Sequence, residues 1–303
     1  MARGLLGIED LSRPEIEALL ERARQFQPQP DQNYPRLESL RGRMIVNLFF
    51  EASTRTRTSF EIAARRLGAE SVSITAAGSS VSKGESLVDT LNTLVAMRPS
   101  AIVMRHGASG APHFLSRYLT TPIVNAGDGT HEHPTQALLD ARTILDRLGR
   151  LDGLRVAIIG DLAHSRVARS NIFLLSKFGV DIVLGGPPMF VPRELTQIAP
   201  GVRRETDIRR AIDGAQVIMM LRVQLERLNE KALPAGEYFK FYGLRLEHLQ
   251  LAAPDVIVMH PGPMNRGLEI SSEVADSQRS MILNQVENGI SVRMAVLEKV
   301  LAS

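Results

Sequence analysis

The 303-residue sequence contains no cysteine and no tryptophan, and aromatic residues make up only 5% of it. The absence of cysteine excludes disulfide bonds, a thiol nucleophile and cysteine-based metal sites. No apolar run reaches the length of a membrane span, and the N-terminal MARGLLGIEDLSRPEIEALL lacks the continuous apolar core of a secretory signal. We therefore expect a cytoplasmic protein without a membrane partner.

The sequence also lacks a large excess of one charge. Its 36 basic and 33 acidic residues leave a net charge of +3, and no long basic tract is present, so we expect no nucleic-acid partner. Two nucleotide-binding fingerprints are missing as well. There is no GxxxxGK[ST], and the segment GDLAHSR, which follows a strand-like run, does not match GxGxxG; a nicotinamide oxidoreductase is therefore disfavoured.

Apolar strand-like runs alternate with helical patterns through most of the chain. The runs are 44–50, 71–75, 101–106 and 122–127 in a first series, and 155–161, 181–187, 216–221 and 255–263 in a second. This alternation predicts an α/β fold with two doubly wound domains, each with a central parallel sheet flanked by helices.

Helical patterns suggest where the two domains divide. The segment 134–153 reads as one long helix ending in glycine, and residues 285–303 read as a terminal helix that packs back onto the first domain. We expect a first domain over 1–134 completed by 285–303, a second domain over 135–284, and a long loop over 228–244, where periodicity is weak.

The segment FFEASTRTRTSFE (49–61) points to an anion site. It leaves an apolar strand and enters a helix through hydroxyls and guanidinium groups, which exceeds what a turn requires. Ser53 or Thr54 can cap the helix, and hydroxyls, Arg55 and the free N–H groups of the helix start suit a phosphate.

Four motifs in this order resemble the aspartate/ornithine carbamoyltransferase family: FFEASTRTRTSFE, HPTQALLD (133–140), LRVQLERL (221–228) and HPGPMNRGLEI (260–270). The likeness runs from end to end, and the last two motifs resemble the aspartate branch. It implies carbamoyl transfer from carbamoyl phosphate to L-aspartate, giving N-carbamoyl-L-aspartate and phosphate in pyrimidine synthesis. No cofactor and no metal are implied.

The resemblance assigns roles in the first domain. Ser53, Thr54, Arg55 and Thr56 would hold the phosphate. Arg105 and His133 would act on the carbonyl oxygen, with Thr56 completing an oxyanion hole, and Gln136 would bind the carbamoyl amide. Of the two neighbouring histidines, His131 and His133, only His133 has the HPxQ context. The predicted catalytic residues are Arg55, Thr56, Arg105 and His133.

In the second domain the same resemblance assigns aspartate binding. Arg166, Arg222 and Gln224 would bind the substrate carboxylates, and the carbonyls of Pro261 and Gly262 would accept hydrogen bonds from the reacting amine and the carbamoyl group. A cis bond is expected at Gly262–Pro263.

The loop AAGSSVSKGES (76–86) implies an assembly. In the family this loop reaches into a neighbouring subunit's site, so Ser79 and Lys83 would complete carbamoyl-phosphate binding, and Lys83 also aspartate binding, in another chain. A homotrimer with shared active sites follows, with regulatory or dihydroorotase subunits as possible companions.

Two alternatives stay open. An ornithine carbamoyltransferase shares the first domain, although its characteristic HCLP motif is replaced by HPGP and Arg222 would repel a cationic substrate side chain. A non-catalytic scaffold homologue would be expected to have lost one of the catalytic positions, and none is missing.

Overall fold

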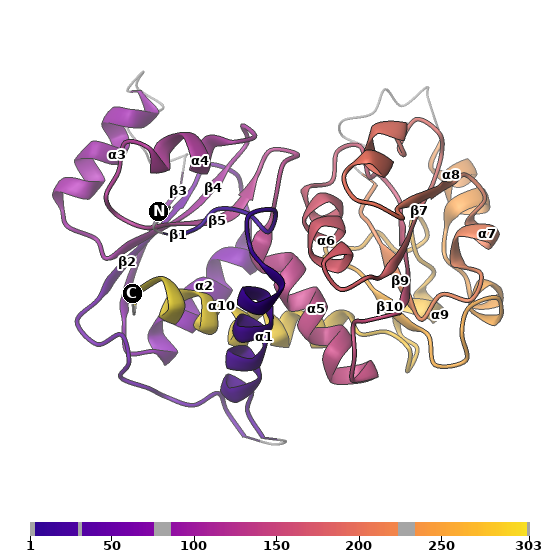
Figure 1. Cartoon of the computed structure of the whole chain (residues 1–303), viewed down its shortest axis with the longest axis horizontal. Helices are drawn as coiled ribbons and strands as arrows, with labels where there is room; N and C mark the ends of the chain where they lie inside the picture. The colour runs from indigo at the N-terminus through magenta and orange to yellow at the C-terminus, as the bar shows by residue number, and fades with distance from the viewer. Residues whose placement is uncertain (1–3, 30–31, 76–85, 224–233, 302–303) are drawn as a thin grey trace. The chain divides into compact units, whose positions relative to one another are not determined.

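The computed structural model describes residues 4–29, 32–75, 86–223 and 234–301. The chain forms two compact units, Met1–Arg142 with Glu287–Ser303 and Thr143–Val286. Each unit has a five-stranded sheet in which all the paired strands are parallel (Figure 1). The predicted α/β fold with two parallel sheets is therefore confirmed.

The sheet of the first unit has the order β1-β5-β4-β2-β3. Its strands are β1 (Gly4–Leu5), β2 (Met44–Phe49), β3 (Glu70–Thr75), β4 (Ala101–His106) and β5 (Ile123–Asp128). One face packs against α3 (Leu87–Ala96) and α4 (Ala111–Ser116), where Val46 and Leu48 join Leu91 and Leu115 in an apolar cluster. The helices α1 (Arg13–Phe26), α2 (Thr54–Arg66) and α10 (Ile282–Leu301) lie on the other side of the sheet (Figure 1).

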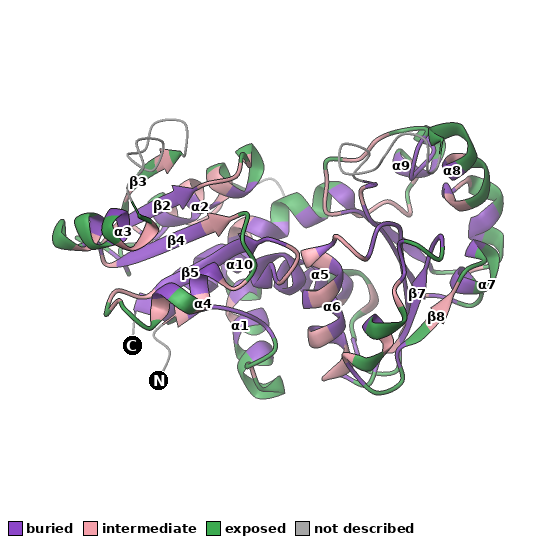
Figure 2. Ribbon diagram, turned by 90° about the horizontal axis from the view of Figure 1, so that it is seen from above, coloured by how far each residue is buried: buried purple, intermediate pink, exposed green. Residues whose placement is uncertain are grey.

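Two helices that lie partly in the first unit and partly in the second are buried around most of their circumference over long stretches. All residues from 132 to 144, which include most of α5 (Pro134–Leu148), are buried, and so are residues 291–297 of α10 (Figure 2). A helix enclosed on all sides belongs to a core and not to a surface layer. The predicted long helix at 134–153 ends earlier than expected, because Gly149 takes a left-handed φ of 73°.

The sheet of the second unit has the order β10-β9-β6-β7-β8. Its strands are β6 (Arg155–Ile159), β7 (Asp181–Gly185), β8 (Arg203–Glu205), β9 (Val217–Met220) and β10 (Ile257–Met259). The helices are α6 (Arg166–Ser176), α7 (Ile208–Ile212), α8 (Ala235–Tyr242) and α9 (Ser272–Ala275). Apolar residues of β6 and β9 pack with those of α7 and α9 in one cluster.

The structure corrects the sequence-based assignment at three places. Strand β1 is only two residues long, and β8 is a short strand of charged residues, so neither has an apolar pattern. The expected loop over 228–244 contains α8; because Tyr238 is the only buried residue of this helix, no apolar stripe marks it. Residues 228–233 lie outside the described residues. Among the helices that the structure describes, none is long and apolar enough to span a membrane.

Candidate active site

The predicted carbamoyl-phosphate residues that the structure describes follow or end strands at the carboxyl edge of the first unit's sheet. Strand β2 pairs with β4 in parallel, with Phe49 opposite Arg105, and β4 pairs with β5. Helix α2 starts just after β2, and the segment carrying His133 follows β5. Ligands of α/β proteins commonly bind beyond the carboxyl ends of parallel strands.

The N-terminus of α2 has features that suit an anion. Ser53 is the N-cap residue, yet among the described contacts its side chain makes no capping hydrogen bond, and no acidic residue occupies the first turn. Thr56 is buried, whereas Arg55 is exposed. Partial desolvation nevertheless lowers the pKa of the Arg55 guanidinium. Free N–H groups, hydroxyls and a guanidinium therefore occur together.

Arg105 is held between two strand ends. Its Nη1 donates to the carbonyl oxygen of Ala126 at 3.2 Å, and its Nε lies 3.5 Å from Oε2 of Glu51. Glu51 was not assigned a role from the sequence, although it stands within FFEASTRTRTSFE. Its negative charge beside a run of arginines was the available signal that Glu51 could pair with a guanidinium group.

His133 and Gln136 lie at the start of α5, and both are buried. The Gln136 backbone N–H donates to the His133 carbonyl at 2.9 Å, and Gln136 Nε2 donates to Asp140 Oδ1 at 2.9 Å. With its amide nitrogen held by Asp140, Gln136 has its side-chain oxygen oriented as the acceptor, which suits an amide NH₂ group. Asp140, four residues along the helix, was also missed by sequence reasoning.

The predicted aspartate residues of the second unit gather at the corresponding edge of its sheet. Arg166 is the first residue of α6, which follows β6, while Arg222 follows β9 and Pro261 follows β10. Since β10, β9 and β6 are consecutive in the sheet, these residues come from neighbouring strand ends. Gln224 lies outside the described residues, as do Ser79 and Lys83.

The backbone at this edge is tightly packed. Gly160 has a φ of +135°, and a Cβ built there would lie 2.8 Å from the carbonyl oxygen of Leu221, so only glycine fits. The Gly262–Pro263 bond is cis, as expected, and Gly262 has a φ of 67°. Glycine adopts this left-handed conformation more easily than other residues. The backbone conformation therefore favours glycine at position 262, whereas the sequence-based role concerned only the carbonyl of this residue.

A buried hydrogen-bond network fixes the segment 260–270. His260 Nδ1 accepts from the Gly262 N–H at 2.8 Å, so the proton resides on Nε2, which lies 3.2 Å from Glu269 Oε1. The same carboxylate oxygen accepts from the Asn265 N–H at 2.6 Å. The motif HPGPMNRGLEI gave no sign of this His–Glu pair, which accepts hydrogen bonds from the backbone N–H groups of Gly262 and Asn265.

The chain has two α/β units, each with a parallel sheet and with guanidinium groups at the carboxyl edge of that sheet. This arrangement is typical of a protein that binds anionic small molecules. The chain belongs to the aspartate/ornithine carbamoyltransferase family. The model of the family's carbamoyl-P binding domain matches residues 3–146, and the model of its Asp/Orn binding domain matches residues 152–300.

The relatives are similar over nearly their whole length. The aspartate carbamoyltransferase catalytic subunit of Solibacter usitatus is 76% identical over 99% of this chain and 100% of its own, and that of Geobacter sulfurreducens is 51% identical over 97% and 95%. Among solved structures, aspartate transcarbamoylase from Trypanosoma cruzi with carbamoyl aspartate and phosphate is 34% identical, with a TM-score of 0.90 over 99% of this chain and 96% of its own. Ornithine carbamoyltransferase from Pyrococcus furiosus is 30% identical, with a TM-score of 0.89 over 100% and 98%.

Proposed function

We propose that the chain is the catalytic chain of an aspartate carbamoyltransferase, which forms N-carbamoyl-L-aspartate and phosphate from carbamoyl phosphate and L-aspartate. The observation that carries this proposal is the pair Arg166 and Arg222 at the ends of neighbouring strands β6 and β9. Two guanidinium groups suit a substrate with two carboxylates and oppose one with a cationic side chain. The 76% identity to a named aspartate carbamoyltransferase catalytic subunit supports the same substrate.

The reaction proceeds by addition and elimination at the carbamoyl carbon. The neutral α-amine of aspartate attacks this carbon, the carbon–oxygen bond to phosphate breaks, and the departing phosphate accepts the amine proton. Thr56, Arg105 and His133 stabilise the oxyanion of the tetrahedral intermediate, while Ser53, Thr54 and Arg55 hold the phosphate. Positioning and preorganised positive charge supply most of the acceleration.

Gln136 binds the carbamoyl amide through its side-chain oxygen, supported by the hydrogen bond of its nitrogen to Asp140. Arg166, Arg222 and Gln224 bind the aspartate carboxylates, and the Pro261 and Gly262 carbonyls accept from the amine and the carbamoyl group. Ser79 and Lys83 come from a neighbouring chain, so the active form is a cytoplasmic homotrimer that serves pyrimidine biosynthesis. Regulatory or dihydroorotase subunits are candidate partners.

The decisive experiment offers the purified chain carbamoyl phosphate with either aspartate or ornithine and measures the ureido product. We expect product with aspartate and none above background with ornithine. Product from ornithine alone would establish the ornithine enzyme, and product from neither would favour the scaffold homologue. An Arg222→Gln variant serves as the internal check: it should raise the KM for aspartate and leave carbamoyl phosphate binding intact, because Arg222 belongs to the second unit.

A further inference from the structure

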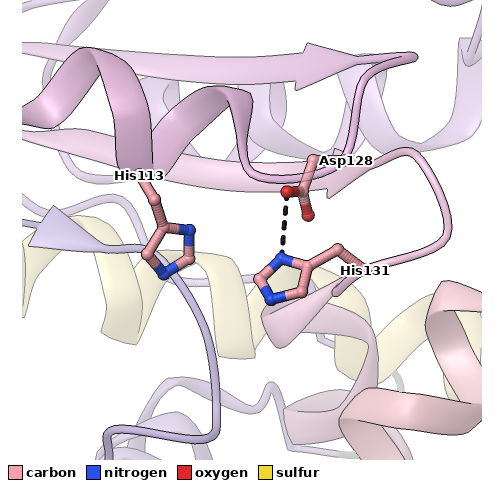
Figure 3. Close-up of side chains that lie close together, drawn as sticks. All are labelled: His113, Asp128 and His131. Atoms are coloured by element: carbon pink, nitrogen blue, oxygen red, sulfur yellow. Dashed lines mark hydrogen bonds and ion pairs between the residues drawn. The ribbon is translucent and has the colours of Figure 1, made fainter.

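Three side chains that the proposed reaction does not use lie close together in the first unit. They are His113 of α4, Asp128 at the end of β5, and His131 in the segment that follows (Figure 3). Each offers one ligand atom, and these atoms lie within 4.8 Å of one another. Within the described part of the chain, no other group of histidine and acidic side chains meets the same condition.

Asp128 is oriented by its surroundings. Its Oδ2 accepts from the Gly110 N–H at 2.6 Å, and its Oδ1 accepts from Asn125 Nδ2 at 2.8 Å and from the Glu132 N–H at 3.1 Å. The carboxylate itself is fully buried. Fixed carboxylates with outer hydrogen-bond partners are typical of metal ligands, because the outer groups set their direction in advance.

The two histidines present nitrogen atoms toward this carboxylate. His131 Nδ1 lies 3.0 Å from Asp128 Oδ2, and the His113 ring meets the His131 ring edge-on with centroids 5.2 Å apart (Figure 3). His113 Nδ1 is shielded from solvent and has no hydrogen-bond partner among the described residues. A shielded ring nitrogen without a partner is costly unless something binds it.

The local charge favours a cation. Besides Asp128, the carboxylates of Glu9 and Asp10 act electrostatically on the His113 ring, and those of Glu9 and Glu132 act on the His131 ring. At His113, burial and the neighbouring His131 outweigh them and lower the pKa of the imidazole, which keeps the ring in the neutral form that binds metal ions. The two imidazoles themselves are only half-buried, so an ion can reach them from solvent.

We propose that His113, Asp128 and His131 bind a first-row divalent transition-metal ion, with Zn²⁺ as the best match. Two imidazole nitrogens and one carboxylate, with water at the remaining position, are a common ligand set for zinc, whereas Mg²⁺ and Ca²⁺ prefer oxygen ligands. The His131 Nδ1 to Asp128 Oδ2 separation of 3.0 Å is close to the spacing of two ligands that share one ion at about 2 Å each. This site departs from the sequence-based expectation of no metal.

The ion would act as a structural clip. It would tie α4 to the segment 128–133, whose last residue is His133, without touching the reacting atoms. The inference does not rest on the proposed function, because it concerns residues with no assigned part in binding either substrate. Its test therefore needs no assay of product.

The test uses the full chain without a histidine tag, stripped of metal with a chelator. Zn²⁺ is titrated in competition with a chromophoric zinc indicator, and thermal unfolding is followed with and without Zn²⁺. We expect one ion per chain and a higher unfolding midpoint with Zn²⁺. His113→Asn and His131→Asn should each weaken binding at least about tenfold.

The matched control is His164→Asn. His164 Nδ1 lies 2.8 Å from Asp161 Oδ1, three residues away, so this pair resembles His131 and Asp128, but among the described residues it has no third ligand group beside it. It should keep wild-type zinc affinity. Absence of stoichiometric binding, or binding unchanged in both cluster variants, would overturn the proposal. Should both variants fail to fold, the electron paramagnetic resonance spectrum of Cu²⁺ bound to the wild type decides: coupling to two ring nitrogens supports the site, and oxygen coordination alone contradicts it.

Discussion

His133 combines a buried position with a predicted role in catalysis, and these two properties can be separated by mutation. The residue is 5% exposed and immediately precedes α5. A buried histidine can serve packing, as His248 does: its Nδ1 accepts from the Arg245 N–H at 3.3 Å in a short helical turn. Activity and stability must therefore be measured on the same variant.

The His133→Ala variant should lose transition-state stabilisation with little loss of folding stability. Removing one oxyanion donor typically costs about 2.7–4 kcal/mol, which corresponds to a fall in kcat of about 10²–10³-fold. The measurement is kcat with saturating aspartate, together with the unfolding midpoint by circular dichroism.

The control for this prediction is His248→Ala, which removes a buried histidine outside the proposed site. It should lower the unfolding midpoint and leave the kcat of the folded protein close to the wild-type value. If His133→Ala instead lowered the unfolding midpoint as much as His248→Ala does, His133 would be a packing residue and the oxyanion assignment would be lost.

The residues of the site differ in how far the sequence could predict them. His133 was predicted because the motif HPTQ marks it, whereas Arg105 lies in none of the four motifs and was assigned by the family resemblance alone. Both follow or end strands at the sheet edge where Ser53 and Thr56 lie. Asp140 and Glu51 were missed because their function is to hold another side chain, and such pairing depends on the path of the backbone. The zinc candidate His113 was missed for the same reason, since it lies fifteen or more residues before its partners.

At the scale of elements, a salt bridge joins the two ends of the chain. Arg22 of α1 donates through Nε to Glu298 Oε2 at 2.6 Å and through Nη2 to Glu298 Oε1 at 3.0 Å, so α1 and α10 share a two-point contact. The hydrogen bonds from Arg22 are the main cause that lowers the pKa of Glu298 below its ordinary 4.5. The Glu298 side chain is 17% exposed, which limits screening by water.

This contact should make stability depend on acidic pH. A carboxyl whose pKa is lowered by folding stabilises the protein above its unfolded pKa, and the contribution is lost as pH falls below 4.5 through the folded value. Glu298→Gln should therefore cost about 0.5–1 kcal/mol at neutral pH, and this deficit should shrink at an acidic pH well below 4.5. Urea unfolding at both pH values measures this.

The comparison variant is Glu17→Gln, which removes the more exposed Arg13–Glu17 pair within α1. Its effect at neutral pH should be smaller. A Glu298→Gln deficit of the same size at both pH values would mean that packing, and not charge, makes this contact.

Elements with a strong apolar period were predictable, and elements without one were not. The run MIVNLFF became β2 because it is buried on both faces of the sheet, and the C-terminal pattern became α10. Strand β8, with the sequence RRE, and helix α8, with one buried residue, carry no such signal, because tertiary contacts alone determine them. Their existence could be learned only from the fold.

At the scale of the whole molecule, the shared-site hypothesis predicts complementation between inactive chains. A chain with Lys83→Ala lacks the group donated to its neighbour, and a chain with His133→Ala lacks a group of its own site. Every mixed trimer then contains one intact site. With random reassociation, roughly three-quarters of the trimers are mixed, and each of these has one intact site out of three. The mixture should therefore recover about a quarter of wild-type activity.

The pair His133→Ala and Arg55→Ala provides the negative control, since both substitutions fall within one chain's own site. Mixing these two variants should restore nothing. Equal activity in both mixtures, or none in either, would contradict a site completed by a neighbouring chain; sedimentation of the mixtures verifies that reassociation took place.

The return of α10 to the first unit has a consequence for biosynthesis. Val292, Met294 and Leu297 are interior residues of the unit that contains residues 1–142, yet they are synthesised only after the whole of residues 143–286. During translation, the earlier unit must wait with part of its apolar interior uncovered while residues 143–286 are being made. The second unit can therefore complete its fold before the first one does, although synthesis of the first unit starts earlier.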